Sequence, residues 1–209
     1  KPEVLLGKSP DLIIFGSLAY LIGAIDEKGI NIEYLERGQK PVHWCTACGS
    51  ALAEAEVEYQ DKVSPAIDVA FEVVDVAHML SSFNTKQTLS ALSVPIWTTT
   101  PWTLPANQAV AMNPTIEYAL VAYLVGEDKR HIVIAEALVP AVMTRYGVEE
   151  YVIIASAQGA VFEGLLLQHP FLNRRVPIIL GDHVTIDAGT GNVHTAPVHG
   201  IDDYKMGQK

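Results

Sequence analysis

The chain has 209 residues, of which 49% are hydrophobic and 18% are charged. This composition predicts a folded globular protein with room for one large domain, or for one domain and an appendage. The 14 basic and 24 acidic residues give a formal net charge of −10. This charge argues against a protein that coats nucleic acid, because such binding relies mostly on Lys and Arg contacts with phosphates. It still allows contact with one RNA end.

The longest apolar run lies near the N-terminus, at residues 12–25 (LIIFGSLAYLIGAI). A run of this length is too short to cross a bilayer as a helix, so we expect it to form part of a core. A helix is one interpretation, although Gly16 and Gly23 weaken it. The run has no basic flank leading to a small-residue cleavage site, which argues against a signal peptide and predicts no membrane partner.

The only two cysteines of the chain, Cys45 and Cys48, have the spacing C-x-x-C. So few cysteines argue against a disulfide framework and favour a reducing, cytoplasmic setting. Structural zinc takes four ligands, so the pair is either half of a site completed elsewhere or two plain thiols. His43 stands too close to Cys45 for a typical third ligand. The Ala/Glu-rich residues that follow, up to residue 59, suit a helix or a helix-to-strand passage.

Beyond residue 60 the sequence is dominated by short β-rich runs. Residues 66–75 (AIDVAFEVVD) alternate between apolar and polar types, which predicts a strand. Further runs of this kind are SVPIW, IEYALVAYLV, HIVIA and YVIIA. Residues 136–147 predict a short helix, and residues 176–197 predict two strands joined by a tight turn at DAGTGN. Six or more strands without a repeated βαβ unit favour a mixed α/β, β-rich fold, with a barrel-like sheet and peripheral helices.

Residues 97–107 (WTTTPWTLPAN) crowd hydroxyls, indoles and prolines into one short stretch. A strand runs into the threonines, and the two prolines stiffen its exit because proline fixes φ and cannot pair in a ladder. Threonine hydroxyls at a strand end can bind an ester oxygen or a ribose hydroxyl in a cleft. The alternative interpretation is a β-rich turn in which the Thr and Trp side chains only pack.

Residues 181–204 are rich in acid–base groups. They include His183, His194, His199, Asp182, Asp187, Asp202 and Asp203. A His near a carboxylate is a common arrangement for moving protons at neutral pH. A hairpin turn followed by a solvated acidic loop is the structural alternative. The G-x-S-x-G, P-loop and H-E-x-x-H signatures are absent, so a serine hydrolase, an NTPase and a zincin are unsupported.

Read together, these stretches resemble the editing domain that is inserted in bacterial isoleucyl-tRNA synthetases. The resemblance rests on KPVHWCTACGSALAEAEVEY, IWTTTPWTLPANQAVAMNP, HPFLNRRVPIILGDHV and GDHVTIDAGTGNVHTAPVHGIDDYKMGQK, in this order. It covers about residues 34–209, and nothing is carried onto residues 1–33. We expect a connecting segment with half a zinc knob at residues 1–59 and an editing domain at residues 60–209. The HIGH and KMSKS signatures are absent, so the resemblance implies a fragment without the ATP-dependent ligase site of the full-length enzyme.

The activity that this resemblance implies is hydrolysis of the ester between valine and the 3′ end of tRNA(Ile). Valine lacks one methylene of isoleucine, and this difference changes the binding free energy too little for one apolar pocket to select accurately. A second site that hydrolyses the wrong ester is therefore needed. The resemblance pairs Asp203 with the aspartate that holds the substrate's ammonium, and His194 with a histidine that lines the valine pocket. It also places three threonines around the terminal adenosine and the reacting water, namely Thr98, Thr99 and Thr100.

By the same resemblance, Trp97, Thr103 and Asn107 shape or contact the substrate, and Thr100 with His194 limits the size of the pocket. Editing sites of this kind need no metal. Cys45 and Cys48 resemble half of a zinc knob whose other ligands lie beyond residue 209. The partners implied are the tRNA end and the rest of the synthetase.

Two other hypotheses remain open. A metal-dependent hydrolase would use His194, His199 and Asp203, and is suggested by the local density of such residues. A non-catalytic RNA-binding knob would be built around the C-x-x-C pair.

Overall fold

The chain folds into two compact units. The computed structural model describes residues 12–21, 25–26, 29–30, 35–59, 61 and 63–208. One unit is Ser64–Ala196, and the other combines Lys1–Val63 with Pro197–Lys209. The domain boundary expected after residue 59 stays a prediction, and the two compact units divide after Val63. Residues 197–209, which the sequence groups with the editing domain, lie in the compact unit that contains the N-terminus.

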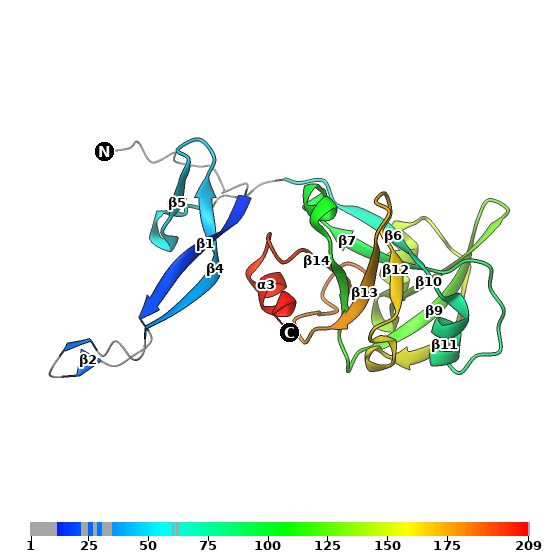
Figure 1. Cartoon of the computed structure of the whole chain (residues 1–209). Coiled ribbons are helices and arrows are strands. Elements are labelled where there is room, and N and C mark those ends of the chain that lie inside the picture. The colour runs from blue at the N-terminus through cyan, green and yellow to red at the C-terminus, as the bar shows by residue number, and fades with distance from the viewer. Residues whose placement is uncertain are drawn as a thin grey trace. The chain divides into compact units, whose positions relative to one another are not determined.

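The unit that contains the N-terminus is built on a three-stranded antiparallel sheet in the order β1-β4-β5 (Figure 1). Its elements are β1 (Leu12–Leu21), β2 (Ile25–Asp26), β3 (Gly29–Ile30), β4 (Leu35–Cys45), β5 (Ser50–Leu52), η2 (Glu54–Glu56) and α3 (Ile201–Gly207). Residues 12–21 of the apolar run form strand β1 rather than a helix, and each of them pairs with a residue of β4. The Ala/Glu-rich segment forms β5 and the single 3₁₀ turn η2 in place of a helix.

The unit of residues 64–196 is built on a mixed sheet of nine strands. These are β6 (Ile67–Val73), β7 (Ser93–Thr98), β8 (Ala109–Met112), β9 (Glu117–Val125), β10 (Asp128–Ala135), β11 (Tyr151–Gln158), β12 (Leu166–Gln168), β13 (Arg175–Leu180) and β14 (Asn192–Thr195). The order is β11-β9-β10-β7-β6-β12-β13-β8-β14, with parallel pairing only for β10/β7 and β13/β8 among these described strands. The predicted mixed, β-rich class is confirmed. The sheet is open, since it begins at β11 and ends at β14 without closing a barrel.

Short helices lie between these strands. They are α1 (Val76–Ser82), α2 (Val139–Arg145) and the 3₁₀ helices η3 (Pro101–Ala106), η4 (Glu136–Leu138) and η5 (Gly159–Phe162). The helix predicted over 136–147 is confirmed as η4 followed by α2, which tolerates Pro140 because proline fits the first turn. The side chain of Asp75 accepts the backbone N–H of His78 and so caps α1, which the sequence did not predict. None of the described helices is long and apolar enough to cross a membrane.

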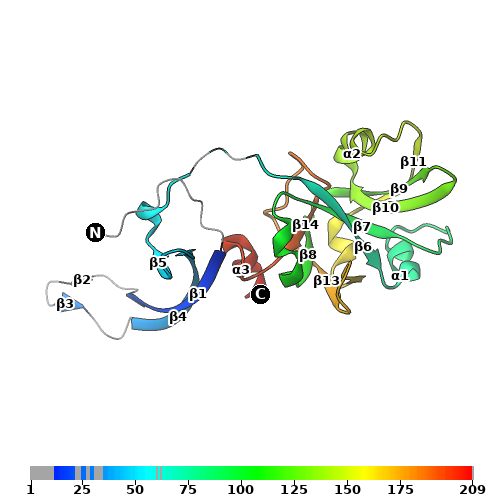
Figure 2. The ribbon, with the colours of Figure 1, turned by 90° about the horizontal axis from the view of Figure 1, so that it is seen from above.

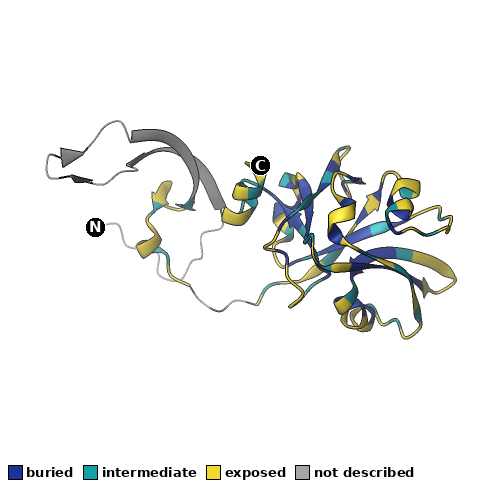
Figure 3. Ribbon diagram, turned by 90° about the horizontal axis from the view of Figure 1, so that it is seen from below, coloured by how far each residue is buried: buried dark blue, intermediate teal, exposed yellow. Residues whose placement is uncertain are grey.

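The core of this unit lies between the inner faces of the strands and the short helices, as the dark blue ribbon in Figure 3 shows. Fully buried side chains include Phe71, Ile96, Tyr118, Ile134 and Phe162. This packed core fixes the strands that carry Thr98 and His194. In particular, β14 lies beside β8 (Figure 2). In this antiparallel pairing, residue 194 lies opposite residue 110.

Candidate functional site

The threonine stretch and the histidine of β14 meet at one place in the sheet. Strand β7 ends at Thr98, η3 begins three residues later at Pro101, and β8 begins three residues after η3 ends. Strand β14 runs antiparallel to β8, and the N–H of Gln108 donates to the carbonyl of Thr195 at 2.9 Å. This pairing brings His194 beside residues that lie roughly ninety positions earlier in the chain.

The threonine turn is held by its own hydroxyls. The backbone N–H of Thr100 donates to Oγ1 of Thr98 at 3.0 Å, and the two hydroxyl oxygens are 3.2 Å apart. The carbonyl of Thr100 accepts both the N–H of Thr103 at 3.1 Å and its hydroxyl at 2.9 Å. Thr98 and Thr103 are buried while Thr100 is exposed. Hydrogen bonds to the buried Thr98 and Thr103 therefore hold the exposed Thr100 in place.

Both nitrogens of the His194 ring are hydrogen bonded within this cluster. Nε2 lies 2.8 Å from Oγ1 of Thr103, and Nδ1 lies 3.1 Å from Nδ2 of Asn107. The same amide nitrogen of Asn107 donates to the carbonyl of Ala109 at 2.8 Å. Asn107 is fully buried and His194 is 9% exposed. The ring is thus fixed by one partner at each of its two nitrogens.

These partners define the proton position of His194. Asn107 can only donate through its amide nitrogen, so Nδ1 is an acceptor. Thr103 gives its one hydroxyl proton to the carbonyl of Thr100, so its oxygen accepts from Nε2. Both sides require the neutral ring with its proton on Nε2. A ring held in this way shapes and orients, and its basic nitrogen faces Asn107 rather than an incoming water.

Three other predicted site residues lie outside this cluster. Trp97 points to the opposite face of β7 from Thr98, as successive strand residues do, and packs against Gly189, whose added Cβ would lie 3.3 Å from that of Trp97. Thr99 is exposed at the end of β7. Asp203 lies on α3, in the unit of residues 1–63 and 197–209. Its meeting with the threonines stays a prediction.

The C-x-x-C pair forms a tight turn after β4. The N–H of Cys48 donates to Sγ of Cys45 at 3.2 Å, and the N–H of Gly49 donates to the Cys45 carbonyl at 2.8 Å. Gly49 adopts φ +64°, which glycine reaches without strain. Neither cysteine forms a disulfide, and the hydrogen bond with Cys45 raises the pKa of Cys48. The turn presents two sulfurs, half of the ligand set that structural zinc requires.

The described part of the chain offers no complete metal site. In the ranges that the structure describes, no three His, Cys, Asp or Glu side chains gather closely enough to hold an ion. His194, moreover, engages both ring nitrogens with Asn107 and Thr103. A metal at His194 would have to displace one of these bonds, so the arrangement does not favour the metal-dependent hydrolase.

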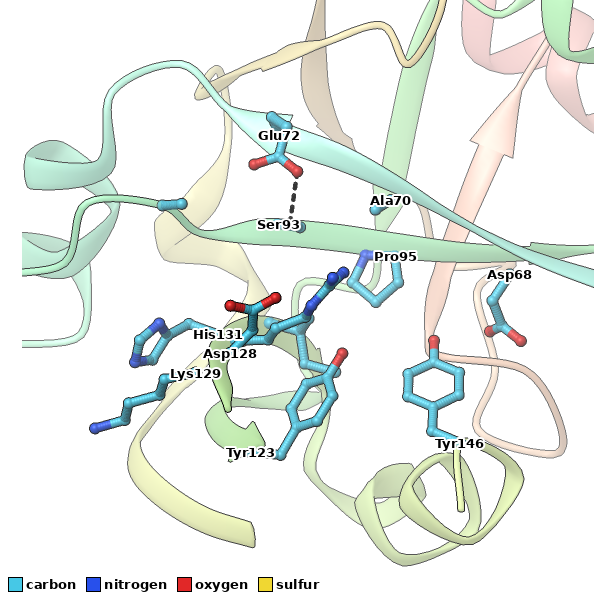
Figure 4. A pocket seen from close by; sticks show the side chains of 13 residues that line it. Asp68, Ala70, Glu72, Ser93, Pro95, Tyr123, Asp128, Lys129, His131 and Tyr146 are labelled. Carbon is cyan, nitrogen blue, oxygen red and sulfur yellow. Dashed lines mark hydrogen bonds between the residues drawn. The ribbon is translucent and has the colours of Figure 1, made fainter. Parts of the chain in front are cut away.

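A separate cavity of about 580 Å³ opens on the other side of β7, and the sequence did not predict it. Figure 4 shows Glu72 accepting a hydrogen bond from Ser93 at 3.0 Å at its wall. The cavity is lined by Asp68, Ala70, Glu72, Ala91, Ser93, Pro95, Tyr123, Asp128, Lys129, Arg130, His131, Ile132 and Tyr146. Burial is the main cause that lowers the pKa of His131. None of the threonine–histidine cluster lines this cavity, so it is distinct from the candidate site.

The comparisons with known proteins agree with this architecture. A family model described as tRNA synthetases class I (I, L, M and V) matches residues 20–174, and the chain belongs to this family. More particularly, it is 57% identical over 176 residues to an isoleucine–tRNA ligase of Coxiella burnetii, a match that covers 84% of this chain and 19% of that one. A Nitrosococcus oceani isoleucine–tRNA ligase is 55% identical over 189 residues, covering 90% and 20% of the two chains. The chain therefore spans about one fifth of the length of these relatives.

Solved structures show where in such enzymes this fold occurs. The editing domain of the P. knowlesi cytosolic leucyl-tRNA synthetase superposes with a TM-score of 0.57 at 12% identity, covering 71% of this chain and 64% of that one. The corresponding P. falciparum domain gives a TM-score of 0.55 at 15% identity, over 66% and 63%. At these identities the likeness shows the fold alone, and the fold is that of a class I synthetase editing domain.

Proposed function

We propose that this chain is the editing domain of an isoleucine–tRNA ligase and hydrolyses valine mischarged onto the 3′ end of tRNA(Ile). The observation that carries the proposal is the fixed His194 ring, held at 2.8 Å by Thr103 and at 3.1 Å by Asn107 beside the threonine turn. Two segments that the sequence analysis assigned to one site lie together. The identity to isoleucine–tRNA ligases supports the choice of substrate class.

The reaction is attack of a water on the ester carbonyl, which releases valine and leaves the ribose hydroxyl on the tRNA. Thr98, Thr99 and Thr100 supply hydroxyls that can donate to the carbonyl and ribose oxygens and accept from the water. His194 forms a rigid wall beside them and does not take the proton, because its Nδ1 already accepts from Asn107. Correct placement of the water and the ester supplies most of the rate.

Selection against isoleucine follows from the size of the space between the Thr100 and His194 side chains. A ring fixed at both nitrogens cannot move aside to admit an extra methylene, so the larger side chain clashes where valine fits. This clash adds to the preference of the ligase site for isoleucine over valine, because the selectivities of two successive sites multiply.

Asp203 is assigned to the α-ammonium of the substrate. A carboxylate suits this task, because a charge-assisted hydrogen bond fixes both position and orientation. Asp203 occupies the first turn of α3, three residues after Gly200 at the N-cap of that helix. The proposal requires that the Asp203 carboxylate and the threonine turn contact the same substrate.

Cys45 and Cys48 are assigned to half of a structural zinc site in the full-length enzyme, with two further ligands from sequence beyond this chain. Their shared turn, with the Cys48 N–H directed at the Cys45 sulfur, fits thiolate ligands. The editing reaction itself uses no metal in this proposal.

The decisive experiment is deacylation of Val-tRNA(Ile) and Ile-tRNA(Ile) by the chain, with and without EDTA. We expect faster release of valine than the uncatalysed rate, little release of isoleucine, and no effect of EDTA. Asp203→Ala and His194→Ala should abolish release of valine while the circular dichroism spectrum is retained. Unchanged deacylation in both variants would refute the assignment of the site, and loss of activity with EDTA would favour the metal-dependent hydrolase.

A further inference from the structure

The turn between β12 and β13 reaches the backbone of η3, the 3₁₀ helix that contains Thr103 and ends at the C-cap Asn107, the two partners of His194. We propose that His169 and Arg174, at the two sides of this turn, are positioning residues for the editing site. They hold η3 so that Thr103 and Asn107 can fix the His194 ring. This inference rests on the proposed function, and it concerns residues that the sequence analysis did not single out.

His169 is bound at both ring nitrogens and is only 2% exposed. Its Nε2 lies 2.9 Å from the carbonyl oxygen of Leu104, which can only accept, so Nε2 carries the proton. Its Nδ1 accepts the backbone N–H of Leu172 at 3.1 Å and that of Phe171 at 3.4 Å. The ring therefore joins its own turn to η3 through a defined tautomer.

Arg174 makes a second bond to the same helix. Its Nη2 donates to the carbonyl of Pro105 at 3.0 Å. The turn between His169 and Arg174 is closed by their backbones, since the N–H of His169 donates to the carbonyl of Arg174 at 2.9 Å. Gln168 adds side-chain bonds to the carbonyls of Leu172 and Arg174 at 2.9 and 3.1 Å. These bonds stabilise the turn, and the turn makes hydrogen bonds to two consecutive carbonyls of η3, those of Leu104 and Pro105.

These two carbonyls lie between the residues that fix His194. Leu104 and Pro105 follow Thr103 and precede Asn107 along the chain. The carbonyl of Leu104 also accepts the backbone N–H of Asn107 at 2.9 Å. A shift of η3 relative to β14 would lengthen the 2.8 Å contact between Thr103 and Nε2 of His194. Because 3₁₀ helices have poor internal hydrogen-bond geometry, their placement depends strongly on outside contacts such as these.

Packing alone does not account for a histidine at position 169. The ring lies edge-on to Phe71, with centroids 5.8 Å apart, and to Phe171, with centroids 4.6 Å apart. A phenylalanine would satisfy these aromatic contacts without any buried polar atom. The hydrogen bond to Leu104 is what distinguishes histidine here, because a buried polar ring is normally retained with its partners satisfied.

The test compares His169→Phe, which keeps a ring between the two phenylalanines, with His169→Gln, which can still donate toward the Leu104 carbonyl. Single-turnover deacylation of Val-tRNA(Ile) gives a rate constant and a half-saturation concentration for each variant. We expect the rate constant of His169→Phe to fall about ten- to a hundredfold, as for small misplacements of catalytic groups, with half-saturation nearly unchanged. His169→Gln should recover part of the loss. Phe83→Leu, in the ring cluster with Phe162, is the control for destabilisation alone.

A second readout follows His194 directly. Nitrogen-15 NMR of the imidazole should show the single tautomer protonated on Nε2 in the wild-type chain and in Phe83→Leu, and a mixture of tautomers in His169→Phe. An unchanged His194 spectrum and rate constant in His169→Phe would overturn the inference. If His169→Phe does not fold, Arg174→Met replaces it in both measurements, because this variant removes the hydrogen bond to the carbonyl of Pro105. An unchanged His194 spectrum and rate constant in Arg174→Met would then overturn the inference. If the wild-type chain fails to hydrolyse the ester, the proposed function falls, while the NMR result still decides whether His169 positions His194.

Discussion

Replacing Thr103 by valine tests the cluster most simply, because the two side chains have nearly the same shape and only the hydroxyl is lost. Oγ1 of Thr103 accepts from Nε2 of His194 at 2.8 Å and donates to the carbonyl of Thr100 at 2.9 Å. After the substitution, the carbonyl of Thr100 still accepts a hydrogen bond from the backbone N–H of residue 103, at 3.1 Å. The substitution therefore removes the hydrogen-bond acceptor that Thr103 provides for the N–H at Nε2 of His194.

The size of the effect follows from this lost partner. A buried donor deprived of its acceptor costs about 1–3 kcal/mol in the free energy of unfolding. For a chain of this size, that loss lowers the melting temperature by about 3–9 °C. The matched control is Thr144→Val, which removes an exposed hydroxyl that donates to the carbonyl of Pro140 at 2.8 Å. Water replaces that exposed bond, so its cost should stay within about 0.5 kcal/mol.

The assay is urea unfolding followed by tryptophan fluorescence, with deacylation of Val-tRNA(Ile) measured in the same preparations. We expect Thr103→Val to lose both stability and rate, while Thr144→Val keeps both. Wild-type stability and rate in Thr103→Val would show that His194 does not depend on Thr103. Equal losses in the two variants would show that the hydroxyl at 103 has no special role.

Three further predictions concern groups outside this cluster. Burial raises the pKa of Tyr118 from its ordinary 10.0 to about 12. Its contribution to stability is therefore complete below pH 10 and is lost as the pH rises toward 12. Tyr118→Phe should flatten that decline in unfolding experiments, and an equally steep decline would contradict the assignment. Asp68→Asn breaks the 2.7 Å ion pair with Arg145, which is partly exposed, so the loss should be at most about 1 kcal/mol and should shrink in 1 M salt. A loss that does not depend on salt would be inconsistent with an ion pair. The hydrogen bond with Cys45 raises the pKa of Cys48, so alkylation of Cys48 at pH 8 should be slower than in Cys45→Ala, and equal rates would count against the bond.

The β-rich class and most strands could be predicted from the sequence because their alternation and turn residues are local signals. The strand over residues 66–75 and the helix over residues 136–147 are examples, found as β6 and as η4 with α2. Strand β8 was missed because all four of its residues are apolar and buried, which removes the alternation that marks a strand. The apolar run at 12–25 was ambiguous, since only its pairing with β4 decides between helix and strand.

Part of the candidate site could be predicted and part could not. Thr98, Thr103, Asn107 and His194 were selected through the family resemblance, and the structure joins them by hydrogen bonds. The tautomer of His194 needed coordinates, because it depends on which atoms of Asn107 and Thr103 face the ring. His169 could not be assigned a role from sequence, since its partner Leu104 contributes only a backbone carbonyl, which every residue possesses.

The proposed function requires that the threonine turn and Asp203 bind one substrate. A crystal structure of the chain with a non-hydrolysable analogue of 3′-valyl-adenosine tests it most directly. We predict that the carbonyl of the analogue lies beside Thr98–Thr100, its side chain against His194, and its ammonium on the carboxylate of Asp203. An analogue bound beside the threonines without Asp203, or bound instead in the cavity lined by Tyr123 and Arg130, would contradict the account.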